Sequence, residues 1–177
     1  MSEPRHVQRD IGWQDRGRSS GILWYFCIVP IILALDQITK ALVVSRMELY
    51  ESIAVIPDFF HLTYILNTGA SFGILQDHFM LFVIVTCLVV VFILWAVLFW
   101  SGAGKLIRIV LGLITGGAIG NLIDRIRFGA VVDFFDFRGI WSYIFNVADM
   151  AVVCGGFLLI IAILAEESKT SESKPKH

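Results

Sequence analysis

Four long runs of apolar residues dominate the pattern of hydrophobic and polar positions along the chain. They are Ile22–Val44, Phe79–Trp100, Leu106–Ile126 and Ile144–Ala165. Each run has about the 20 apolar residues that a helix needs to cross a hydrocarbon core of roughly 30 Å. The first run follows a polar leader and lacks a small-x-small cleavage site, so it is not a cleaved signal peptide. The pattern predicts one membrane domain of four spanning helices over residues 22–165.

Two more polar segments, residues 45–78 and 127–143, separate these runs. Each contains a short stretch rich in aromatic and β-branched residues, Phe59–Leu66 and Val131–Phe137, which predicts a strand. We therefore expect an all-α membrane protein with a small extracytoplasmic β element at the membrane surface. The polar leader (residues 1–21) and tail (residues 166–177) are predicted to be mobile.

The distribution of lysine and arginine indicates the orientation of the helices, because cytoplasmic flanks carry the excess of these residues. One side holds the basic residues of the leader, of the loop between the second and third runs, and of the tail: Arg5, Arg9, Arg16, Arg18, Lys105, Arg108, Lys169, Lys174 and Lys176. The other side holds only Arg46, Arg125, Arg127 and Arg138. Both termini are therefore predicted to be cytoplasmic.

Composition supports a membrane protein and excludes several other classes. Hydrophobic residues make up 57% of the 177 residues and charged residues 16%, with a mean hydropathy of +0.78, so much apolar surface must face lipid. The net charge of -1 gives no indication of nucleic-acid binding. Three cysteines in three different apolar runs do not form a disulfide framework. His61 and His78 lack the spacing of metal ligands, so we expect neither a metal nor another cofactor.

Three acidic residues, Asp36, Asp124 and Asp149, lie inside predicted membrane helices. A charge at mid-bilayer costs roughly 2.5–3.5 kcal/mol on insertion scales, so such residues indicate function. At ~1.5 Å per residue, Asp36 lies about 21 Å from the inner end of its helix and Asp124 about 24 Å beyond Arg108. Asp149 lies about 7 Å below the outer surface. The three acids therefore share a shallow level near the outer face.

Helical spacing predicts which way Asp124 and Asp149 point. Gly112, Gly116, Gly120 and Asp124 recur every four residues, so they share a face on which small residues allow close helix packing. Asn121 lies one turn from Asp124, and Asn146 precedes Asp149 by three residues. The short connection between these two helices makes them antiparallel neighbours, so the two acids are expected to meet.

Two adjacent carboxyl groups share one proton, which provides a general base and a general acid for the hydrolysis of an amide by water. Asp124 and Asp149 are accordingly the predicted catalytic pair. Asp36 has a simpler interpretation, because Lys40 follows it by four residues on the same helical face. Asp133, like Asp136, lies in a predicted surface strand, where a solvated charge is the usual explanation.

The chain resembles the lipoprotein signal peptidases of bacteria, the type II signal peptidases. The resemblance rests on five blocks that occur in the family's order: DQITK at Asp36–Lys40, NTGASFG at Asn67–Gly73, GGAIGNLIDR at Gly116–Arg125, VVDFF at Val131–Phe135 and FNVAD at Phe145–Asp149. The third and fifth blocks are specific, and only the leader and the tail lie outside the matched region.

This resemblance implies a multi-pass peptidase of the bacterial inner membrane with its site near the outer face. It would cleave prolipoproteins before a diacylglyceryl-modified cysteine, in contact with membrane lipid and as a monomer, without a cofactor. Matching the blocks assigns catalysis to Asp124 and Asp149. It assigns substrate binding or shaping of the site to Asn67, Gly69, Asn121, Arg125, Asn146 and Ala148, and support to Asp36, Lys40 and Asp133.

Two other functions are compatible with acids inside membrane helices. A proton-coupled transporter also uses them, but it would favour acids near the midplane, broken helices and inverted repeats. A non-catalytic membrane partner protein would use the acids only for stability.

Overall fold

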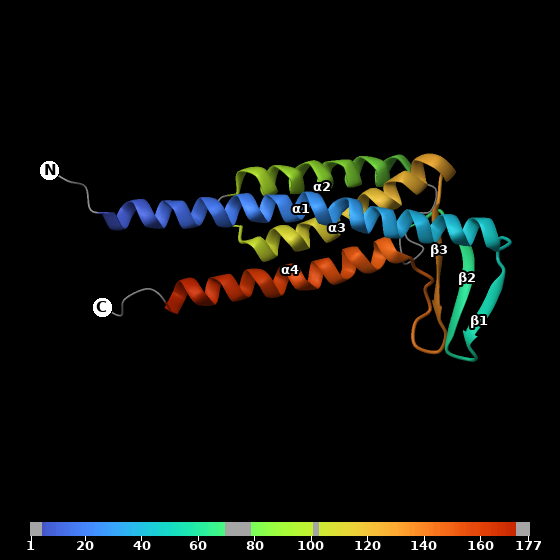
Figure 1. Ribbon diagram of the computed structural model, residues 1–177. Helices are drawn as coiled ribbons and strands as arrows, with labels where there is room; N and C mark the ends of the chain where they lie inside the picture. The colour runs from blue at the N-terminus through green and yellow to red at the C-terminus, as the bar shows by residue number, and fades with distance from the viewer. Residues whose placement is uncertain (1–4, 70–78, 101–102, 173–177) are drawn as a thin grey trace.

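The computed structural model describes residues 5–69, 79–100 and 103–172, so His78 and residues 70–73 of the second motif block lie outside the described part of the chain. Four helices run along one direction and a sheet lies across one end of the bundle (Figure 1). The helices are α1 (Arg5–Arg46), α2 (Phe79–Phe99), α3 (Lys105–Phe128) and α4 (Val147–Glu172). The strands are β1 (Ser52–Ile56), β2 (Phe60–Asn67) and β3 (Val131–Phe137). We call the end of the bundle next to the strands the sheet end.

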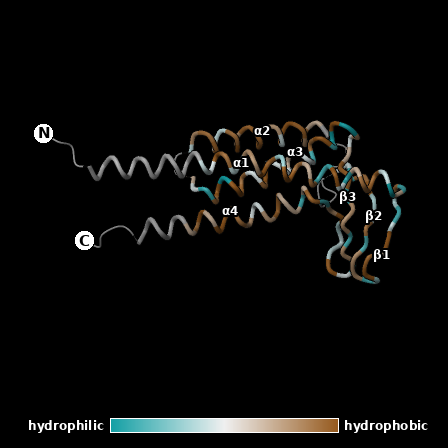
Figure 2. Tube along the Cα trace, viewed as in Figure 1, coloured by the Kyte–Doolittle hydropathy of each residue, from teal (hydrophilic) through white to brown (hydrophobic). Residues whose placement is uncertain are grey.

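The four predicted spanning helices are confirmed within the described residues. The segments that are long and apolar enough to cross a membrane are Ser20–Arg46, Met80–Phe99, Lys105–Phe128 and Val147–Ala165. Hydrophobic residues follow one another along these helices, and hydrophilic residues gather toward the sheet end (Figure 2). Helix α1 begins at Arg5 and α4 continues to Glu172, so both helices extend into the polar leader and tail.

Helix α3 is the centre of the bundle. In its apolar window 56% of the residues are buried, against 17% in the windows of the other three helices. Helix α3 packs against α1, α2 and α4, and the outer surfaces of those three helices remain apolar. Three helices therefore face lipid while α3 carries the polar residues that lipid would exclude.

Arg108 is an example of a polar residue that α3 keeps from lipid. The sequence pattern counted it as a loop charge, but it lies in the first turn of α3 and is fully buried. Its guanidinium donates hydrogen bonds to the backbone carbonyls of Val97, Trp100 and Ala103, around the C-terminal end of α2. Carbonyls at a helix end lack partners within the helix, so Arg108 satisfies them and fixes α2 against α3.

The glycine ridge of α3 packs against α1. A Cβ atom on Gly112 would lie 3.1 Å from Ile28 Cβ, and one on Gly116 would lie 2.8 Å from Ile32 Cβ. Gly120 lies directly against the carboxylate of Asp36. The small residues thus bring the backbone of α3 close to α1, as spacing by four predicts, and they also bring the polar residues of the two helices together.

The three strands form an antiparallel sheet in the order β1-β2-β3. β2 and β3 match the predicted strands, whereas β1 was not predicted. A register shift between Leu62 and Ile65 leaves one extra residue in β2 opposite β3. Tyr64, Val132 and Phe134 bury their side chains with Val43 of α1. This cluster fixes the sheet to the end of the longest helix.

We expect Gly116→Ala to destabilise the bundle, because the added Cβ would also lie 3.0 Å from the Val29 carbonyl oxygen, where the backbone of α1 cannot move freely. Overpacking of this kind costs about 1–3 kcal/mol. Thermal unfolding of the purified protein in detergent measures the loss. Gly156→Ala is the matched control, because a Cβ at Gly156 meets nothing within 4 Å. Equal melting temperatures for the two variants would show that the ridge is not a close contact.

Candidate active site

Lys40 is the centre of a buried ionic cluster between α1 and α3. Its Nζ lies 2.9 Å from Asp36 Oδ2 and 2.9 Å from Asp124 Oδ2, and it donates a hydrogen bond of 2.8 Å to Asn121 Oδ1. The side chain of Lys40 is 3% exposed, and both carboxylates are at least as well buried. The pairing of Asp36 with Lys40 that the sequence indicated is present, and Asp124 shares the same ammonium group.

The position of Asp124 differs from the predicted meeting with Asp149. Its Oδ1 accepts a hydrogen bond of 3.0 Å from Gln37 Nε2, and its Oδ2 accepts one of 3.1 Å from the backbone N–H of Val132 in addition to the contact with Lys40. The cause is the glycine ridge, which turns the face of α3 that carries Asp124 toward α1, while Gly117 on another face of α3 packs against Ala148 of α4. Both oxygens of Asp124 therefore bind donors from other elements, Gln37 and Lys40 of α1 and the backbone of β3.

The two acids of the cluster each bind a backbone amide of another element. Asp36 Oδ1 accepts a hydrogen bond of 3.0 Å from the N–H of Ala148, in the first turn of α4. Asp124 Oδ2 accepts a hydrogen bond from the backbone N–H of Val132 in β3. Ala148 directly precedes Asp149, and Val132 directly precedes Asp133. The cluster around Lys40 thus fixes the backbone at the two remaining buried acids.

Asp149 lies in the first turn of α4 and is half-buried. Its Oδ1 accepts a hydrogen bond of 2.8 Å from Asn121 Nδ2, and its Oδ2 accepts one of 3.2 Å from the backbone N–H of Asn146. The backbone N–H of Asp149 donates in return to Asn146 Oδ1 at 2.9 Å. This reciprocal pair caps the N-terminus of α4, which explains why the helix begins at Val147 rather than at the predicted Ile144.

Asp133 is 1% exposed, so its interpretation as a solvated strand residue is wrong. Its two oxygens accept hydrogen bonds from Asn146 Nδ2 at 2.6 Å and from Asn67 Nδ2 at 2.9 Å. Side chains alternate along β3, so Val132 and Phe134 pack against α1 while Asp133, on the other face, lies next to the start of α4. Asn146 contacts Asp133 through its side chain and Asp149 through its backbone, so one residue connects the two acids.

The charge of Asp149 acts on Asp133. Burial raises the pKa of Asp133, and the nearby negative charge of Asp149 raises it further, to about 7. Hydrogen bonds from Asn67 and Asn146 and the positive charge of Lys40 lower the same pKa but do not offset the two larger effects. A pKa near 7 for Asp133 is what a general acid or base that works at neutral pH would need.

The other predicted site residues surround this pair. The guanidinium of Arg125 lies 4.8 Å from the ring centre of Phe82 in α2, and its Nη1 donates to the Asn121 carbonyl at 3.4 Å. The N–H of Gly69 donates to Asn67 Oδ1 at 3.0 Å, which orients the amide that binds Asp133. Asn121, Asn67, Asn146 and Ala148 all contribute hydrogen bonds to the buried acids, as shown above.

Sequence reasoning missed Gln37. Its Nε2 lies within hydrogen-bond distance of Asp36 Oδ2, the Gly120 carbonyl and Asp124 Oδ1, at 3.0–3.2 Å. The signal was available, because Gln37 belongs to the DQITK block and is a polar amide inside an apolar helix. It was overlooked because an uncharged side chain has a lower insertion cost than a charged one and so attracted no functional hypothesis.

One asparagine connects the carboxyl groups of Asp133 and Asp149 at the sheet end of four helices that are apolar enough to span a membrane, an arrangement compatible with a membrane-embedded protease of the aspartyl type. Residues 28–165 match the family model described as signal peptidase (SPase) II. The chain belongs to the signal peptidase II family.

Similar proteins agree with this assignment. The lipoprotein signal peptidase of Halothermothrix orenii is 49% identical over 142 residues, which cover 80% of this chain and 96% of that protein. The lipoprotein signal peptidase of Pelotomaculum thermopropionicum is 46% identical and covers 87% of this chain and 100% of its own. A solved bacterial membrane enzyme, determined by the in meso method at 2.3 Å resolution, superposes with a TM-score of 0.76 at 32% identity, covering 86% of this chain and 93% of its own.

Replacing Lys40 tests the ionic cluster. Lys40→Met leaves Asp36 and Asp124 buried without their cation, and breaking a buried pair in this way costs about 3–5 kcal/mol. We expect a large fall in melting temperature in detergent. Lys105→Met is the matched control, because Lys105 is exposed and its Nζ lies over the Trp24 ring at 4.8 Å. A Lys40→Met protein that melts like the control would contradict a structural role for the cluster.

Proposed function

We propose that this protein cleaves the signal peptide from diacylglyceryl-modified prolipoproteins, on the N-terminal side of the lipidated cysteine. Two kinds of observation support this activity. The relatives over most of the chain are named lipoprotein signal peptidases, at 43–49% identity. The sequence also carries the five motif blocks of that family, and four of their polar groups converge on Asp133 and Asp149.

We further propose that Asp133 and Asp149 are the catalytic pair, in place of the predicted Asp124 and Asp149. The observation that carries this choice is the contact of Asn146 with both acids, through its side chain to Asp133 and its backbone to Asp149. The raised pKa of Asp133 has the charge of Asp149 among its causes. Asp124 instead contacts Lys40, Gln37 and the N–H of Val132, so both of its oxygens are engaged within the protein.

The pair would act by the chemistry of two carboxyl groups that share one proton. The ionised carboxylate takes a proton from water while the resulting hydroxide attacks the scissile carbonyl carbon. The protonated partner donates its proton to the carbonyl oxygen, and later transfers return a proton to the leaving amine. The amides of Asn67, Asn121 and Asn146 hold the two carboxyl groups in place, so little reorganisation is needed during the reaction.

The remaining predicted residues would bind or position the substrate around this pair. Arg125 stacks on Phe82 beside the site, and a guanidinium in that place would bind substrate carbonyl oxygens. The segment after Asn67 begins with the turn at Gly69, which would bring backbone groups near the peptide. Asp36, Lys40, Gln37 and Asp124 would serve as positioning residues through the backbone of α4 and β3.

The site would work at the outer face of the bacterial inner membrane. The excess of lysine and arginine in the leader, the α2–α3 connection and the tail favours cytoplasmic termini. The start of α1 and the end of α4 lie at the end of the bundle opposite the sheet (Figure 1). The sheet end and its aspartates would then be extracytoplasmic, at the depth where a lipid holds the modified cysteine. A monomer, without nucleic acid or cofactor, would suffice for this reaction.

Asparagine substitutions test the catalytic pair. We expect Asp133→Asn and Asp149→Asn each to reduce cleavage at least about a thousandfold, because the pair then lacks either its acid or its base. Cleavage of a diacylglyceryl-modified prolipoprotein by purified protein in detergent measures the effect, with unfolding temperature as the check on folding. Asp136→Asn is the matched control, because Asp136 is on the same strand but binds Thr63 and Arg138.

Asp124→Asn distinguishes the two candidate pairs. We expect this variant to melt at a lower temperature, because Lys40 loses one of its two carboxylates, and its folded fraction to keep measurable cleavage. A stable Asp124→Asn protein without activity, together with an active Asp133→Asn protein, would restore the pair predicted from the sequence. Full activity in every variant would exclude an aspartyl mechanism and leave a non-catalytic role for the acids.

The pKa of Asp133 predicts the alkaline limit of activity. Below a pH of about 7 Asp133 holds its proton, and above it both members of the pair become ionised and the general acid is lost. We therefore expect kcat/KM to fall as the pH rises through about 7, which an assay on either side of neutrality measures. The free energy of unfolding should also fall as the pH rises from about 3.8 to about 7. In this range the folded state keeps the proton of Asp133, which the unfolded chain, with a pKa near 3.8, has released. Activity that rises steadily with pH would contradict this proton assignment.

A further inference from the structure

The register of the sheet separates its side chains onto two faces. Ile65 lies opposite Asp133, Leu62 opposite Phe135 and Phe60 opposite Phe137, so these residues share one face with the proposed catalytic aspartate. On the neighbouring strand, Ile53 pairs with Leu62 and Ile56 pairs with Phe60. Beyond Asp133 and Asn67, which bind each other, the paired residues on this face are apolar. We call it the site face.

The opposite face is polar in its outer part. Ser52 Oγ lies 2.8 Å from Thr63 Oγ1, and Thr63 donates to Asp136 Oδ2 at 2.8 Å. Arg138 reaches the same group, with hydrogen bonds to Ser52 Oγ at 2.8 Å and to Asp136 Oδ2 at 3.1 Å. These residues satisfy one another across three strands. The sheet therefore has one face suited to water and one face suited to an apolar partner.

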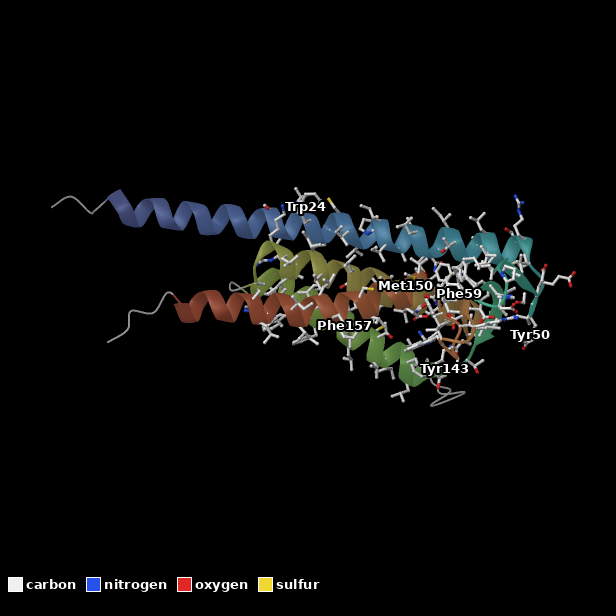
Figure 3. All side chains as sticks on the ribbon, turned by 90° about the horizontal axis from the view of Figure 1, so that it is seen from below. Trp24, Tyr50, Phe59, Tyr143, Met150 and Phe157 are labelled. Atoms are coloured by element: carbon white, nitrogen blue, oxygen red, sulfur yellow. The ribbon has the colours of Figure 1, made fainter. Side chains whose placement is uncertain are left out.

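Aromatic rings cover the site face next to the aspartates. Phe60 and Phe137 stack with ring centres 4.7 Å apart, and Phe145 stacks on Phe137 at 5.8 Å and contacts Phe135 at 5.9 Å. All four rings are only half-buried. We call Phe60, Phe135, Phe137 and Phe145 the aromatic ladder. Phe59, at the end of the ladder, and Tyr143 lie with the side chains around the sheet end, far from Phe157 on α4 (Figure 3).

The aromatic ladder is continuous with the proposed catalytic pair. Phe135 follows Asp133 by two residues on the same face, about 7 Å along the strand. Phe145 directly precedes Asn146, the residue that contacts both aspartates. The backbones of Phe135 and Phe145 are hydrogen-bonded to each other at 2.7 and 3.1 Å. The ladder is therefore held rigidly to both sides of the site.

We propose that the aromatic ladder binds the diacylglyceryl group of the substrate, at its glyceryl carbons and the first carbons of its acyl chains. This inference rests on the proposed function. In such a substrate only Cα, Cβ and Sγ of the modified cysteine lie between the scissile nitrogen and the glyceryl group, a reach of roughly 5 Å. A scissile bond at Asp133 and Asp149 thus places the glyceryl group next to Phe135 and the first acyl carbons next to Phe137 and Phe60.

The position of the ladder suits this ligand. The sheet lies across the end of the bundle (Figure 1), and its site face meets the start of α4 where Asp133 binds Asn146. Aromatic rings favour the boundary between headgroups and acyl chains, and exposed Trp141 and Tyr143 lie 6.5 Å apart in the connection after β3. Acyl chains that leave the ladder would run down beside the helices. The ladder would therefore select for the lipid while the aspartates act on the peptide.

A comparison of two substrates tests the proposal. One peptide carries a cysteine with two long acyl chains, and the other is identical except that both chains are shortened to butyryl. For Phe137→Leu and for Phe60→Leu we expect the preference for the long-chain peptide, measured as a ratio of kcat/KM values, to fall about tenfold. The change should lie in KM for the long-chain peptide, with kcat preserved. Phe157→Leu, on the exposed surface of α4, is the matched control and should keep the wild-type preference.

A preference that stays at the wild-type ratio in folded Phe137→Leu protein would overturn the proposal, as would an equal loss in Phe157→Leu. Failure of the wild-type protein to cleave either peptide would instead contradict the proposed function.

Crosslinking tests lipid binding at the ladder without measuring cleavage. For this experiment a benzophenone amino acid replaces Phe137 in an Asp149→Asn background. We expect an adduct with the long-chain peptide that excess unlabelled lipopeptide suppresses at least tenfold and phosphatidylglycerol does not. Adducts with bulk phospholipid alone would make the ladder a membrane anchor and overturn the proposal.

Discussion

The contact of the buried Lys40 ammonium with two carboxylates is the interaction on which the rest of the structure depends. Burial of a lone carboxylate or a lone ammonium group costs much free energy, and the contacts among Asp36, Asp124 and Lys40 offset that cost. The cluster has one positive and two negative charges, and backbone N–H groups of Ala148 and Val132 stabilise the excess negative charge. Those amides belong to α4 and β3. The same cluster that pairs the charges of α1 and α3 thus also fixes α4, which carries Asp149, and β3, which carries Asp133.

The aspartates that neutralise a cation and the aspartates suited to proton transfer are therefore different residues. Both oxygens of Asp124 are engaged by donors from α1 or β3, so Asp124 connects α3 to these two elements. Asp133 and Asp149 accept hydrogen bonds only from amides and face no direct cation in the described contacts. Carboxyl groups held by neutral donors keep their capacity to exchange a proton.

The sequence predicted the helices well because a run of about 20 apolar residues has few alternatives to a spanning helix. It also identified the buried acids and the pairing of Asp36 with Lys40, which is local. It could not predict which acids of different helices meet, because helical spacing defines a face but not its neighbour. Gly116 brought that face to α1 rather than to α4. Asp133 was misread because a strand pattern does not reveal that one face of the strand is covered. β1 was missed because SIAVI lacks alternation, and all five of its residues are exposed.

The two proposed catalytic acids lie on different kinds of element, and this difference has a chemical consequence. Asp149 is fixed at the N-terminus of α4 by hydrogen bonds from the N–H of Asn146 and the side-chain amide of Asn121. Asp133 is on a strand outside the spanning segments, where burial disfavours its charge. The two acids therefore have unequal surroundings, as an acid and a base with different tasks would require. Because β3 also carries part of the aromatic ladder, the strand that positions one acid would also lie against the lipid of the substrate, which would couple recognition of the lipid to placement of the scissile bond.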